Sequence, residues 1–399
     1  MYADKEYILK LRHQLHEYPE IGFELPKTIS LVKHELDSLG IEYTEKYGES
    51  SIVAIVNPQK DHFTIGIRAD MDALLIEEKT DLPFKSKIKG QMHACGHDAH
   101  TAMLLGTAKV LKAMEDELAC RVLLVFQPSE EGVRSGAEEL VRGGLMEEID
   151  IIIGMHIENW LESGTIGVCK GSSMASSRNL RIDFYGATAH ATLPHTGIDA
   201  LGAAVRTYNN IQHMLGRELN PFAKYVCSIG KLEGGTTQNV IADHAYMLGT
   251  IRTFDMEVDS FLIRRIEEIA QNCAREIGAR TEINTSLKAF VVYNNPYLSD
   301  LVLTSAEKVV GGKRIVHMPE KMSSEDFSQY LTEKPGVFIR LGTRNEKKGC
   351  ITLPHNNDFM IDEDALPFGT DTCVQFVLDN MNGVDMKQIV DSDERRKKR

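Results

Sequence analysis

The 399-residue sequence lacks the features that mark several classes of protein. It contains no apolar run of about 18 residues, so it predicts no membrane-spanning helix. The first residues, Met-Tyr-Ala-Asp-Lys-Glu, have neither the charged n-region nor the apolar h-region of a signal peptide. The 45 lysines and arginines are outnumbered by 58 aspartates and glutamates, and the net charge of −13 argues against nucleic acid as the partner.

Cysteine is scarce and irregularly spaced. The chain has seven cysteines, an odd number that argues against a disulfide framework and predicts a reducing, cytoplasmic compartment. None of them supplies the second Cys-pair knuckle that a structural zinc knot would need. The hydrophobic share of 42% and the charged share of 26% are typical of a globular protein, and the length is sufficient for two domains.

Residues with metal-binding side chains are concentrated in one stretch, His-Ala-Cys-Gly-His-Asp-Ala-His at 93–100. Cys95 and His97 are separated by a single glycine, which lets the backbone bend so that both side chains reach one metal ion. Without a second cysteine pair, the remaining ligands would be His, Asp or Glu, as in catalytic metal sites. The alternative is that Cys95 is a buried small hydrophobe and the histidines are surface or core polar residues.

The next candidate ligands follow an apolar run. Residues 121–126 predict a buried parallel strand, which Pro128 ends. Glu130 and Glu131 then lie on the loop at its carboxyl end, the edge at which open α/β sheets bind ligands. On an extended backbone their carboxylates point in different directions, so one can bind metal while the other faces a water molecule. A solvated acidic loop is the alternative interpretation.

Two histidines lie at comparable positions further along the chain. The run Ile-Asp-Ile-Ile-Ile-Gly-Met-His (149–156) predicts a third strand that ends on His156. His355 lies on the loop Leu-Pro-His-Asn-Asn-Asp (353–358). A histidine at the end of a buried strand is either a ligand at this sheet edge or a core residue whose hydrogen bonds are satisfied.

The order of the expected elements up to residue 157 indicates an α/β domain. Strands and helices alternate there, which predicts a mostly parallel sheet. The helix at 98–118 starts directly behind His97, and its positive N-terminal end would favour the thiolate form of Cys95. The other expected elements are helices at 4–17 and 26–39 and strands at 51–56, 62–68, 121–126 and 149–156.

The middle of the chain has the order β-α-β-β-α-β, that of a ferredoxin-like α+β unit. Its strands are expected at 178–186, 224–231, 244–253 and 280–290, and its helices at 197–218 and 257–277. Because this unit lies between His156 and His355, it interrupts the first domain. We therefore expect a discontinuous α/β domain (1–177 and 291–390) and an inserted domain (178–290).

The last residues, 391–399, contain no apolar side chain, which predicts a disordered tail. A basic recognition patch is the alternative for this tail, but acidic residues directly precede its basic residues and favour a solvated end.

A series of further motifs occurs in order through nearly the whole chain. They are Arg-His-Gln-Leu-His-Glu-Tyr-Pro-Glu-Ile-Gly-Phe-Glu (12–24), Arg-Ala-Asp-Met-Asp-Ala-Leu (68–74), Gln-Pro-Ser-Glu-Glu-Gly (127–132), Ala-His-Ala (189–191), Gly-Gly-Thr-Thr-Gln-Asn-Val-Ile-Ala (234–242), Gly-Thr-Ile-Arg-Thr (249–253) and Ser-Ser-Glu-Asp-Phe (323–327). With the cysteine motif and the His355 loop, the sequence resembles the amidohydrolase branch of the zinc-type aminoacylase and carboxypeptidase family. That branch includes hippurate hydrolases, N-acyl-amino-acid amidohydrolases and auxin-conjugate hydrolases.

The resemblance implies a metal-dependent amidohydrolase with two divalent metal ions. In relatives the cysteine bridges the metal pair, whose ligands match Cys95, His97, Glu131, His156 and His355. The residue that matches Glu130 is the general base in relatives. Zinc suits ligands of this kind, and manganese, cobalt and nickel are alternatives.

The resemblance also implies a role for the inserted domain. In relatives it is a lid that also forms the dimer interface, so we expect a homodimer or a dimer of dimers. His190 is a candidate oxyanion donor, and Asn239 and Arg252 are candidates for holding a substrate carboxylate. A structural role for His190 and a surface salt bridge for Arg252 are the alternatives.

Other polar residues would support the ligands. We assign Asp70 and Asp72 to orienting the ligand imidazoles, and His93 and His100 to similar support or to packing. The sequence departs from many relatives at Thr188-Ala189, at an extra histidine (His195) and at Glu158-Asn159-Trp160. These departures bear on the pockets for the acyl group and the side chain, and they leave the fold intact.

The function that the sequence favours is hydrolysis of the amide bond of N-acyl amino acids, with a small-molecule substrate and neither nucleic acid nor membrane as partner. A narrow-specificity deacetylase, aminobenzoyl-glutamate hydrolase or dipeptidase of the same family is the alternative. A non-catalytic ligand-binding protein on this scaffold is a third hypothesis, against which Glu130 argues, because a pure binder has no use for a general base.

Overall fold

The computed structural model describes residues 2–393, which form two compact units. The inserted unit contains residues 174–291 and a short segment, 320–325, which the sequence places in the first domain. Within the described part of the chain, no helix has the length and apolarity needed to span a membrane. The larger unit contains the rest, residues 2–173, 292–319 and 326–393.

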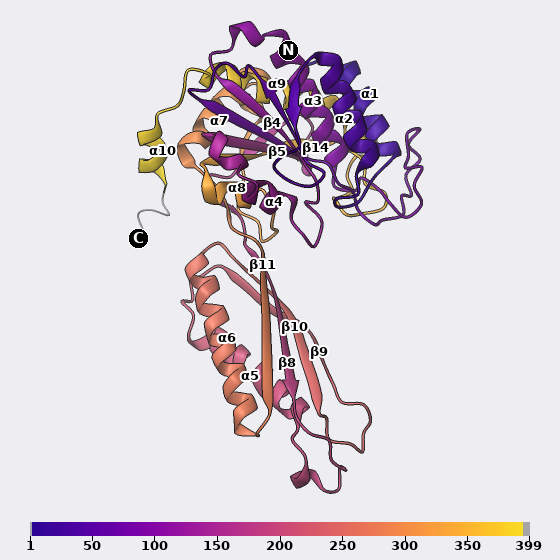
Figure 1. The fold of residues 1–399 in the computed structure, drawn as a ribbon, viewed down its shortest axis with the longest axis vertical. Coiled ribbons are helices and arrows are strands. Elements are labelled where there is room, and N and C mark those ends of the chain that lie inside the picture. The colour runs from indigo at the N-terminus through magenta and orange to yellow at the C-terminus, as the bar shows by residue number, and fades with distance from the viewer. Residues whose placement is uncertain (1, 394–399) are drawn as a thin grey trace. The chain divides into compact units, whose positions relative to one another are not determined.

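The larger unit is built on an eight-stranded sheet with the order β1-β2-β4-β3-β5-β14-β6-β13 (Figure 1). The four central strands are parallel: β4 (Arg121–Gln127), β3 (Thr64–Asp70), β5 (Ile151–Glu162) and β14 (Gly336–Arg344). The flanking strands are β1 (Glu42–Thr44), β2 (Ile52–Val56), β6 (Ile166–Val168) and β13 (Ile315–His317). Strand β3 is buried along its whole length, so its two faces are both covered, and buried and exposed side chains do not alternate along it. The predicted mostly parallel sheet is confirmed.

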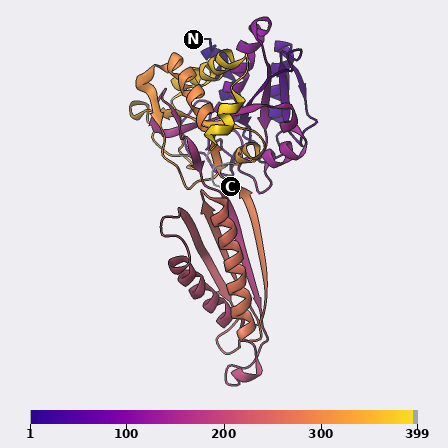
Figure 2. The ribbon, with the colours of Figure 1, turned by 90° about the vertical axis from the view of Figure 1, so that its left-hand side faces the viewer.

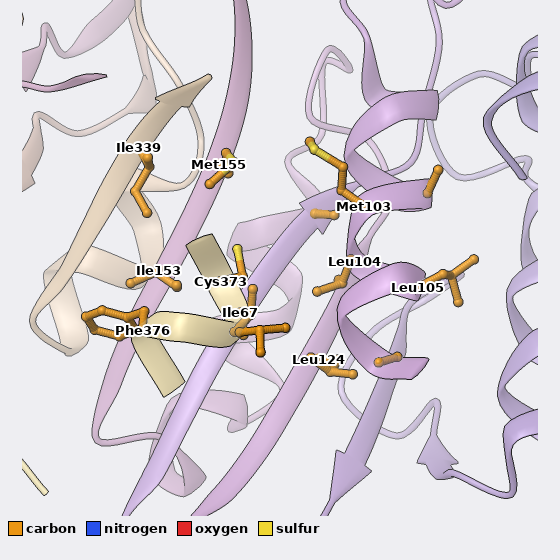
Figure 3. Close-up of a cluster of buried hydrophobic side chains, with 14 of the residues drawn as sticks. Ile67, Met103, Leu104, Leu105, Leu124, Ile153, Met155, Ile339, Cys373 and Phe376 are labelled. Carbon is orange, nitrogen blue, oxygen red and sulfur yellow. The ribbon is translucent and has the colours of Figure 1, made fainter. Parts of the chain in front are cut away.

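Helices α3 (His97–Ala113) and α9 (Leu366–Asn380) pack on the central strands. Both are buried on most of their surface, as expected of helices that lie inside a domain. A cluster of buried apolar side chains holds α3, whose first turn carries His97, against the sheet. Figure 3 shows its members Met103, Leu104 and Leu105 of α3, Cys373 and Phe376 of α9, and Ile67, Leu124, Ile153, Met155 and Ile339 of the sheet.

The remaining helices of the larger unit surround this core. Helix α1 (Lys5–Glu17) packs against α3 and α9, and α2 (Pro26–Leu39) against α3. Helix α7 (Pro296–Val310) packs against α9. The shorter elements are α4 (Gly136–Arg142), α8 (Ser328–Glu333), β7 (Gly171–Met174) and β12 (Val292–Asn294).

The last described helix corrects the predicted start of the tail. Helix α10 (Met386–Ser392) begins behind Asp385, whose carboxylate accepts hydrogen bonds from the backbone of Lys387 and Gln388. It also buries Ile389. Residues 391 and 392, which the sequence assigns to a disordered tail, therefore belong to a capped helix. Asp393 is the residue at the end of this helix, and residues 394–399 of that predicted tail lie outside the described residues.

The inserted unit is a separate antiparallel sheet with the order β11-β8-β10-β9. Helices α5 (Ala200–Arg217) and α6 (Met256–Glu276) lie side by side and pack on this sheet (Figures 1 and 2). This order and these connections are those of a ferredoxin-like unit, as the sequence predicts. The strands are β8 (Ser177–Tyr185), β9 (Tyr225–Gly234), β10 (His244–Thr253) and β11 (Arg280–Ala289).

Alternating side chains give this sheet one covered face. Leu180, Ile182 and Phe184 of β8 are buried in a cluster with the apolar residues of α5 and α6. Arg181, between two of them, is exposed on the opposite face. The period of two that predicts β8 from the sequence is therefore the pattern that packs the inserted unit.

Candidate metal centre

The turn between Cys95 and His97 is one that only glycine fits. Gly96 has φ +88°, and a Cβ at this position would lie 2.6 Å from Cγ1 of Ile157. The turn brings Sγ of Cys95 to 3.4 Å from Nε2 of His156 on the neighbouring strand. The predicted bend at this glycine is confirmed.

His156 presents one ring nitrogen to Cys95. Its Nδ1 lies 2.5 Å from the carbonyl oxygen of Ile157 and can only donate to it, which leaves the lone pair of Nε2 facing the cysteine. Burial, together with the charges of His100 and Arg340, holds the pKa of His156 well below its usual value. The imidazole is therefore neutral, as a metal ligand must be.

The predicted strand end at His156 is wrong. Strand β5 continues to Glu162, because β14 pairs with it as far as Arg344–Glu162. His156 still lies at the edge of the sheet where strand β3 ends. The two strands pair as far as Arg68–Gly154, so His156 is level with Asp70, the last residue of β3.

Asp72 holds the loop that carries the two glutamates. Its Oδ1 accepts a hydrogen bond from the backbone of Glu130 at 3.0 Å, and its Oδ2 accepts one from the backbone of Glu131 at 3.1 Å. Oδ1 also lies 3.3 Å from Nδ1 of His97. Asp72 therefore fixes the backbone of both glutamates and places its charge beside the imidazole that the sequence predicts it to orient.

Two of the residues at this site have strained backbone. Ser129, directly before the glutamates, has φ +52°, and His355 has φ +66°. Non-glycine residues in this region cost about 1–3 kcal/mol and gather at functional sites. The His355 loop is tied to the cysteine motif, because His355 N donates to Ala94 O at 2.8 Å. Nε2 of His355 lies 2.8 Å from Oε1 of Glu131.

The predicted ligands form two groups that share one atom. The ligand atoms of Cys95, His97 and His156 lie within 4.8 Å of one another. Those of Cys95, Glu131 and His355 do the same. The sulfur of Cys95 belongs to both groups, so it is the atom through which two cations could be joined. Glu130 forms a further group of this kind with His97 and Glu131.

The charges around His97 favour a bound cation. Both of its ring nitrogens are buried without a hydrogen-bond partner among the described residues. Burial disfavours the imidazolium, but the carboxylates of Asp70, Asp72 and Glu131 outweigh it and raise the pKa of His97 to about 10. This anionic, incompletely satisfied pocket fits a divalent metal ion, which would replace the proton as the counter-charge.

The pKa of the Cys95 thiol differs in direction from what its position at the start of α3 alone predicts. Burial and the nearby carboxylates of Glu131 and Glu130 raise its pKa well above the usual value. The predicted preference for thiolate is therefore wrong for the metal-free protein, because burial and like charge outweigh the positive end of α3. A bound cation would have to supply the charge that stabilises the thiolate.

Two further histidines lie outside the predicted ligand set: the ring nitrogens of His100 are both bonded, and those of His93 have no partner among the described residues but belong to no group of ligand atoms. Nδ1 of His100 lies 2.6 Å from Oδ1 of Asp70, and its Nε2 accepts from the backbone of Ile157 at 2.9 Å, so both ring nitrogens are taken. His93 is buried near His16, and burial lowers its pKa to about 3. His93 is thus a neutral packing group.

The motif at 12–24 holds the first turn of α3 through side chains of helix α1. Sequence reasoning missed this role. Nε of Arg12 and Nδ1 of His16 lie 3.1 and 2.8 Å from Oδ2 of Asp98, the residue after His97. All three side chains are buried. The signal was present, because Arg12 and His16 are four residues apart and therefore share one face of α1.

The tripeptide Glu158-Asn159-Trp160 also supports the centre. The side-chain amide of Asn159 donates to the carbonyl oxygens of Thr352 at 2.8 Å and Met360 at 2.7 Å. These residues flank the loop that carries His355. The tripeptide that departs from many relatives therefore positions the His355 loop through Asn159.

In the inserted unit, His190 and Asn239 lie on paired loop segments. Ala191 N donates to Asn239 O at 2.9 Å, and Ile241 N donates to Ala189 O at 2.9 Å. Both predicted site residues are exposed. Nδ1 of His190 accepts from the backbone of Thr192 at 3.2 Å, so in the neutral ring the proton is on Nε2, which is then a donor.

Arg252 lies at the opposite end of the same sheet. Strands β8 and β10 pair from Tyr185–His244 at the end near His190 to Arg178–Ile251 at the end near Arg252. Nη1 of Arg252 lies 3.0 Å from Oγ of Ser324, and no carboxylate among the described residues lies within ion-pair distance of it. Burial lowers the pKa of Arg252. The alternative of a surface salt bridge does not hold for this residue.

Comparison with known proteins identifies the family. The model of "Peptidase family M20/M25/M40" matches residues 66–379. The chain belongs to this family. Thermostable carboxypeptidase 1 of Saccharolobus solfataricus is 37% identical over 368 residues, which cover 92% of this chain and 93% of that protein. IAA-amino acid hydrolase ILR1-like 4 of Arabidopsis thaliana is 36% identical over 368 residues, which cover 91% and 83%.

A solved structure agrees with this assignment. The YXEP protein of Bacillus subtilis, described as a dinuclear metal-binding peptidase from the M20 family, is 31% identical, with a TM-score of 0.81 and coverage of 95% of this chain and 99% of that one. The predicted resemblance is confirmed. As a member of the peptidase family, the protein is a metal-dependent hydrolase that acts on amide bonds.

Proposed function

We propose that this member of the peptidase family hydrolyses N-acyl amino acids with the help of two divalent metal ions. The observation that carries the proposal is the pair of ligand groups that share Cys95, one buried and one reaching the surface at His355, with the carboxylate of Glu130 beside them. The ions would be held by Cys95, His97, Glu131, His156 and His355. Zinc suits these ligands best, and manganese, cobalt or nickel are alternatives.

The chemistry follows from the weakness of both reactants. An amide carbonyl is a poor electrophile, and water is a poor nucleophile at neutral pH. Bound divalent ions would supply a Lewis acid for the carbonyl and lower the pKa of water towards about 7. Glu130 would take a proton from the attacking water and deliver it to the leaving nitrogen. Asp72 holds the backbone of Glu130, so the carboxylate starts from a fixed position.

The substrate class is supported by Arg252 and by the names of relatives. IAA-amino acid hydrolase, carboxypeptidase and N-acetyl-L-cysteine deacetylase each name an amide whose nitrogen belongs to an amino acid. The carboxylate of such an amino acid suits a partly buried guanidinium whose hydrogen-bond partners are the neutral oxygens of Ser324 and Met322. A carboxylate could bind it through two hydrogen bonds.

The geometry of the inserted unit supports a homodimer or a dimer of dimers. His190 and Arg252 are separated by the length of β8, which has 9 residues, or roughly 30 Å at about 3.3 Å per residue. A small substrate that binds Arg252 of one chain therefore cannot also contact His190 of that chain. His190, donating from Nε2 to the developing oxyanion, and Asn239 would instead serve the site of a neighbouring subunit.

The edge of the inserted sheet supports the same assembly. Strand β9 pairs only with β10 in the described sheet, and Val226 and Leu232 on β9 are exposed. An unpaired edge of this length is a template for a second copy. The inserted domain (178–290) would thus act as lid and dimer interface for the catalytic domain (1–177 and 291–390).

All seven cysteines are free, which supports a cytoplasmic location.

A substrate screen tests this proposal. Acetyl, benzoyl and indoleacetyl amino acids, aminobenzoyl-glutamate and dipeptides would be offered to the protein with added Zn²⁺ or Mn²⁺. We expect hydrolysis of N-acyl amino acids, its loss on chelation and its return with added ion. If the protein hydrolyses only dipeptides, or only one acetylated amino acid, it is instead a dipeptidase or a narrow-specificity deacetylase. The names of the carboxypeptidase and deacetylase relatives support these alternatives. Full activity without bound metal would contradict the mechanism.

A further inference from the structure

The motif Ser-Ser-Glu-Asp-Phe at 323–327 has no part in the mechanism above, yet it lies where the chain passes from one unit to the other. Its first three residues cluster with the inserted unit, and Asp326 and Phe327 belong to the larger unit. Phe327 is fully buried and stacks on Phe338 of β14 with ring centroids 5.0 Å apart. The motif is therefore anchored in the larger unit directly after the crossing.

Asp326 is a buried carboxylate whose oxygens meet several hydrogen-bond donors, and a carboxylate oxygen of Glu130 also lies within 4.8 Å of it. Its Oδ1 lies 3.0 Å from Nη2 of Arg68 and 3.0 Å from Nε2 of Gln127. Its Oδ2 accepts from Oγ of Ser135 at 2.6 Å and from the backbone of Ala137 at 3.3 Å. A charge with only 5% of its surface exposed costs several kcal/mol in desolvation, which complete hydrogen bonding offsets.

Arg68 connects this carboxylate to the metal centre. Its guanidinium also lies 2.6 Å, through Nη1, from Oδ2 of Asp70. Oδ2 of Asp70 is in turn 3.8 Å from Nε2 of His97, and Oδ1 of Asp70 is 2.6 Å from Nδ1 of His100. The guanidinium also donates from Nε to Oε1 of Gln127 at 2.8 Å, so it has three partners. Removing the charge of one carboxylate weakens this set and lets the guanidinium shift relative to the other carboxylate.

The other end of the motif holds the candidate carboxylate binder. Ser324 accepts the hydrogen bond from Arg252 at 3.0 Å, inside the inserted unit. The same segment is fixed to that unit because Ala175 N donates to the carbonyl oxygens of Lys321 and Ser323 at 3.1 and 3.0 Å. Ser324 and Asp326 are two residues apart in the chain.

We propose that Asp326 is a positioning residue of the metal centre, acting through Arg68 and Asp70 on His97, and that Ser324 at the other end of the same motif positions Arg252. The motif then sets the metal site and the carboxylate-binding arginine from one short stretch of chain. This inference rests on the proposed metal site and substrate class.

The variant Asp326→Asn tests the first half. It keeps the shape of the side chain and removes the charge that holds Arg68. The matched control is Asp259→Asn, which breaks an Asp–Arg pair in the inserted unit whose carboxylate is also buried, where Asp259 lies 2.7 Å from Arg178. The readouts are thermal unfolding and the Kd for Zn²⁺, measured by competition with a chromophoric chelator in the absence of substrate.

We expect both variants to unfold at lower temperature than the wild type, but only Asp326→Asn to bind Zn²⁺ more weakly, by about 10–100-fold. An unchanged Kd in Asp326→Asn would show that the residue only stabilises the fold. If Asp326→Asn does not fold, Arg68→Lys replaces it, since lysine keeps the charge but cannot bridge two carboxylates. An unchanged Kd in that variant overturns the inference equally. A wild type that binds no Zn²⁺ would instead refute the metal site itself.

Ser324→Ala tests the second half. We expect a KM for N-acyl amino acids raised about 10–150-fold, the scale of a lost hydrogen bond to a charged group, with an unchanged Kd for Zn²⁺. An unchanged KM would overturn the role of Ser324. A weaker Kd for Zn²⁺ would also overturn it, because the effect would then lie at the metal centre and not at Arg252.

Discussion

The two units differ in how they hold their candidate site residues. In the larger unit Cys95, His97 and His156 are 8%, 1% and 9% exposed, and their ligand atoms already lie within reach of one cation. In the inserted unit His190 and Asn239 are exposed on loops at one end of the sheet. The candidate ligands meet within one chain, with only His355 exposed among them, whereas we propose that the exposed residues at the sheet end act on a second subunit.

The interiors differ in the same way. The inserted unit has an apolar core in which α5 and α6 cover one face of the sheet. Both units bury ion pairs, but only in the larger unit do they border a candidate metal ligand. The inserted unit pairs Asp259 with Arg178, whereas the larger unit pairs Arg12 with Asp98 and Arg68 with Asp70 and Asp326. Buried ion pairs are weak sources of stability, because desolvation offsets most of their attraction. Their place next to His97 is explained better by positioning than by stability.

The largest expected effect is that of Glu130→Gln. We expect this variant to keep its fold and its metal content and to lose at least ~10²-fold in kcat, because glutamine cannot accept the proton from water. The neighbouring variant Glu131→Gln is the matched control, and it should lose metal instead, since it removes a charged ligand. Metal content is measured by elemental analysis and kcat with saturating substrate.

Either of two results would contradict this division of roles between Glu130 and Glu131. Near-wild-type turnover by Glu130→Gln would remove the general base from the mechanism. If the wild type were itself inactive on every substrate, the hypothesis of a non-catalytic binding protein would be favoured. Loss of metal from Glu130→Gln, with normal metal in Glu131→Gln, would exchange the two assignments.

Most of the fold could be predicted because it depends on local patterns. The alternation of Leu180, Ile182 and Phe184 predicts β8, and it is the same pattern that packs the core of the inserted unit. The continuous apolar run at 121–126 predicts β4 in the same way. Likewise, the spacing of Cys95, Gly96 and His97 predicts a bend that the backbone adopts.

What could not be predicted depends on contacts between distant parts of the chain. The length of β5 is set by its pairing with β14, which lies almost two hundred residues away. The raised pKa of Cys95 comes from its burial and from Glu131 and Glu130, which together outweigh the local effect of the helix start. Arg68 and Asp326 give no local sign that they meet, although alternation along β3 could have placed Arg68 and Asp70 on one side.

The next largest effect tests whether the exposed residues act on a second subunit. His190→Ala should lose about 10²–10³-fold in kcat, the scale of an oxyanion donor, and should keep its metal. Glu130→Gln subunits keep His190 and lack the base. If His190 acts on the neighbouring subunit, random mixing of the two variants should restore about one quarter of wild-type activity, since half of the dimers are mixed and each has one complete site.

Exchange between subunits must be demonstrated for this test, for example by native mass spectrometry of differently tagged chains. Mixed dimers without restored activity would mean that His190 acts within its own subunit or takes no part in catalysis. A monomer in solution at assay concentrations would refute donation between subunits directly.

The smallest effect is expected in the inserted unit when the metal is removed. Every proposed ligand lies in the larger unit, so metal binding should stabilise that unit alone. At a free ion concentration of 100 times Kd, the stabilisation would be about 2.7 kcal/mol. Hydrogen exchange, followed with and without chelator, should therefore quicken at the start of α3 and in residues 127–131, whose opening breaks the site.

Helices α5 and α6 serve as the internal reference in the same experiment. Their amides are protected by an apolar core that contains no proposed ligand, so we expect their exchange to change less than two-fold. Equal loss of protection in both units would mean that they unfold as one cooperative body, and the contrast between a metal-braced unit and an independent one would be wrong. Loss of protection confined to strand β9 would place the effect at the proposed subunit interface, since this edge would be uncovered when dimers separate.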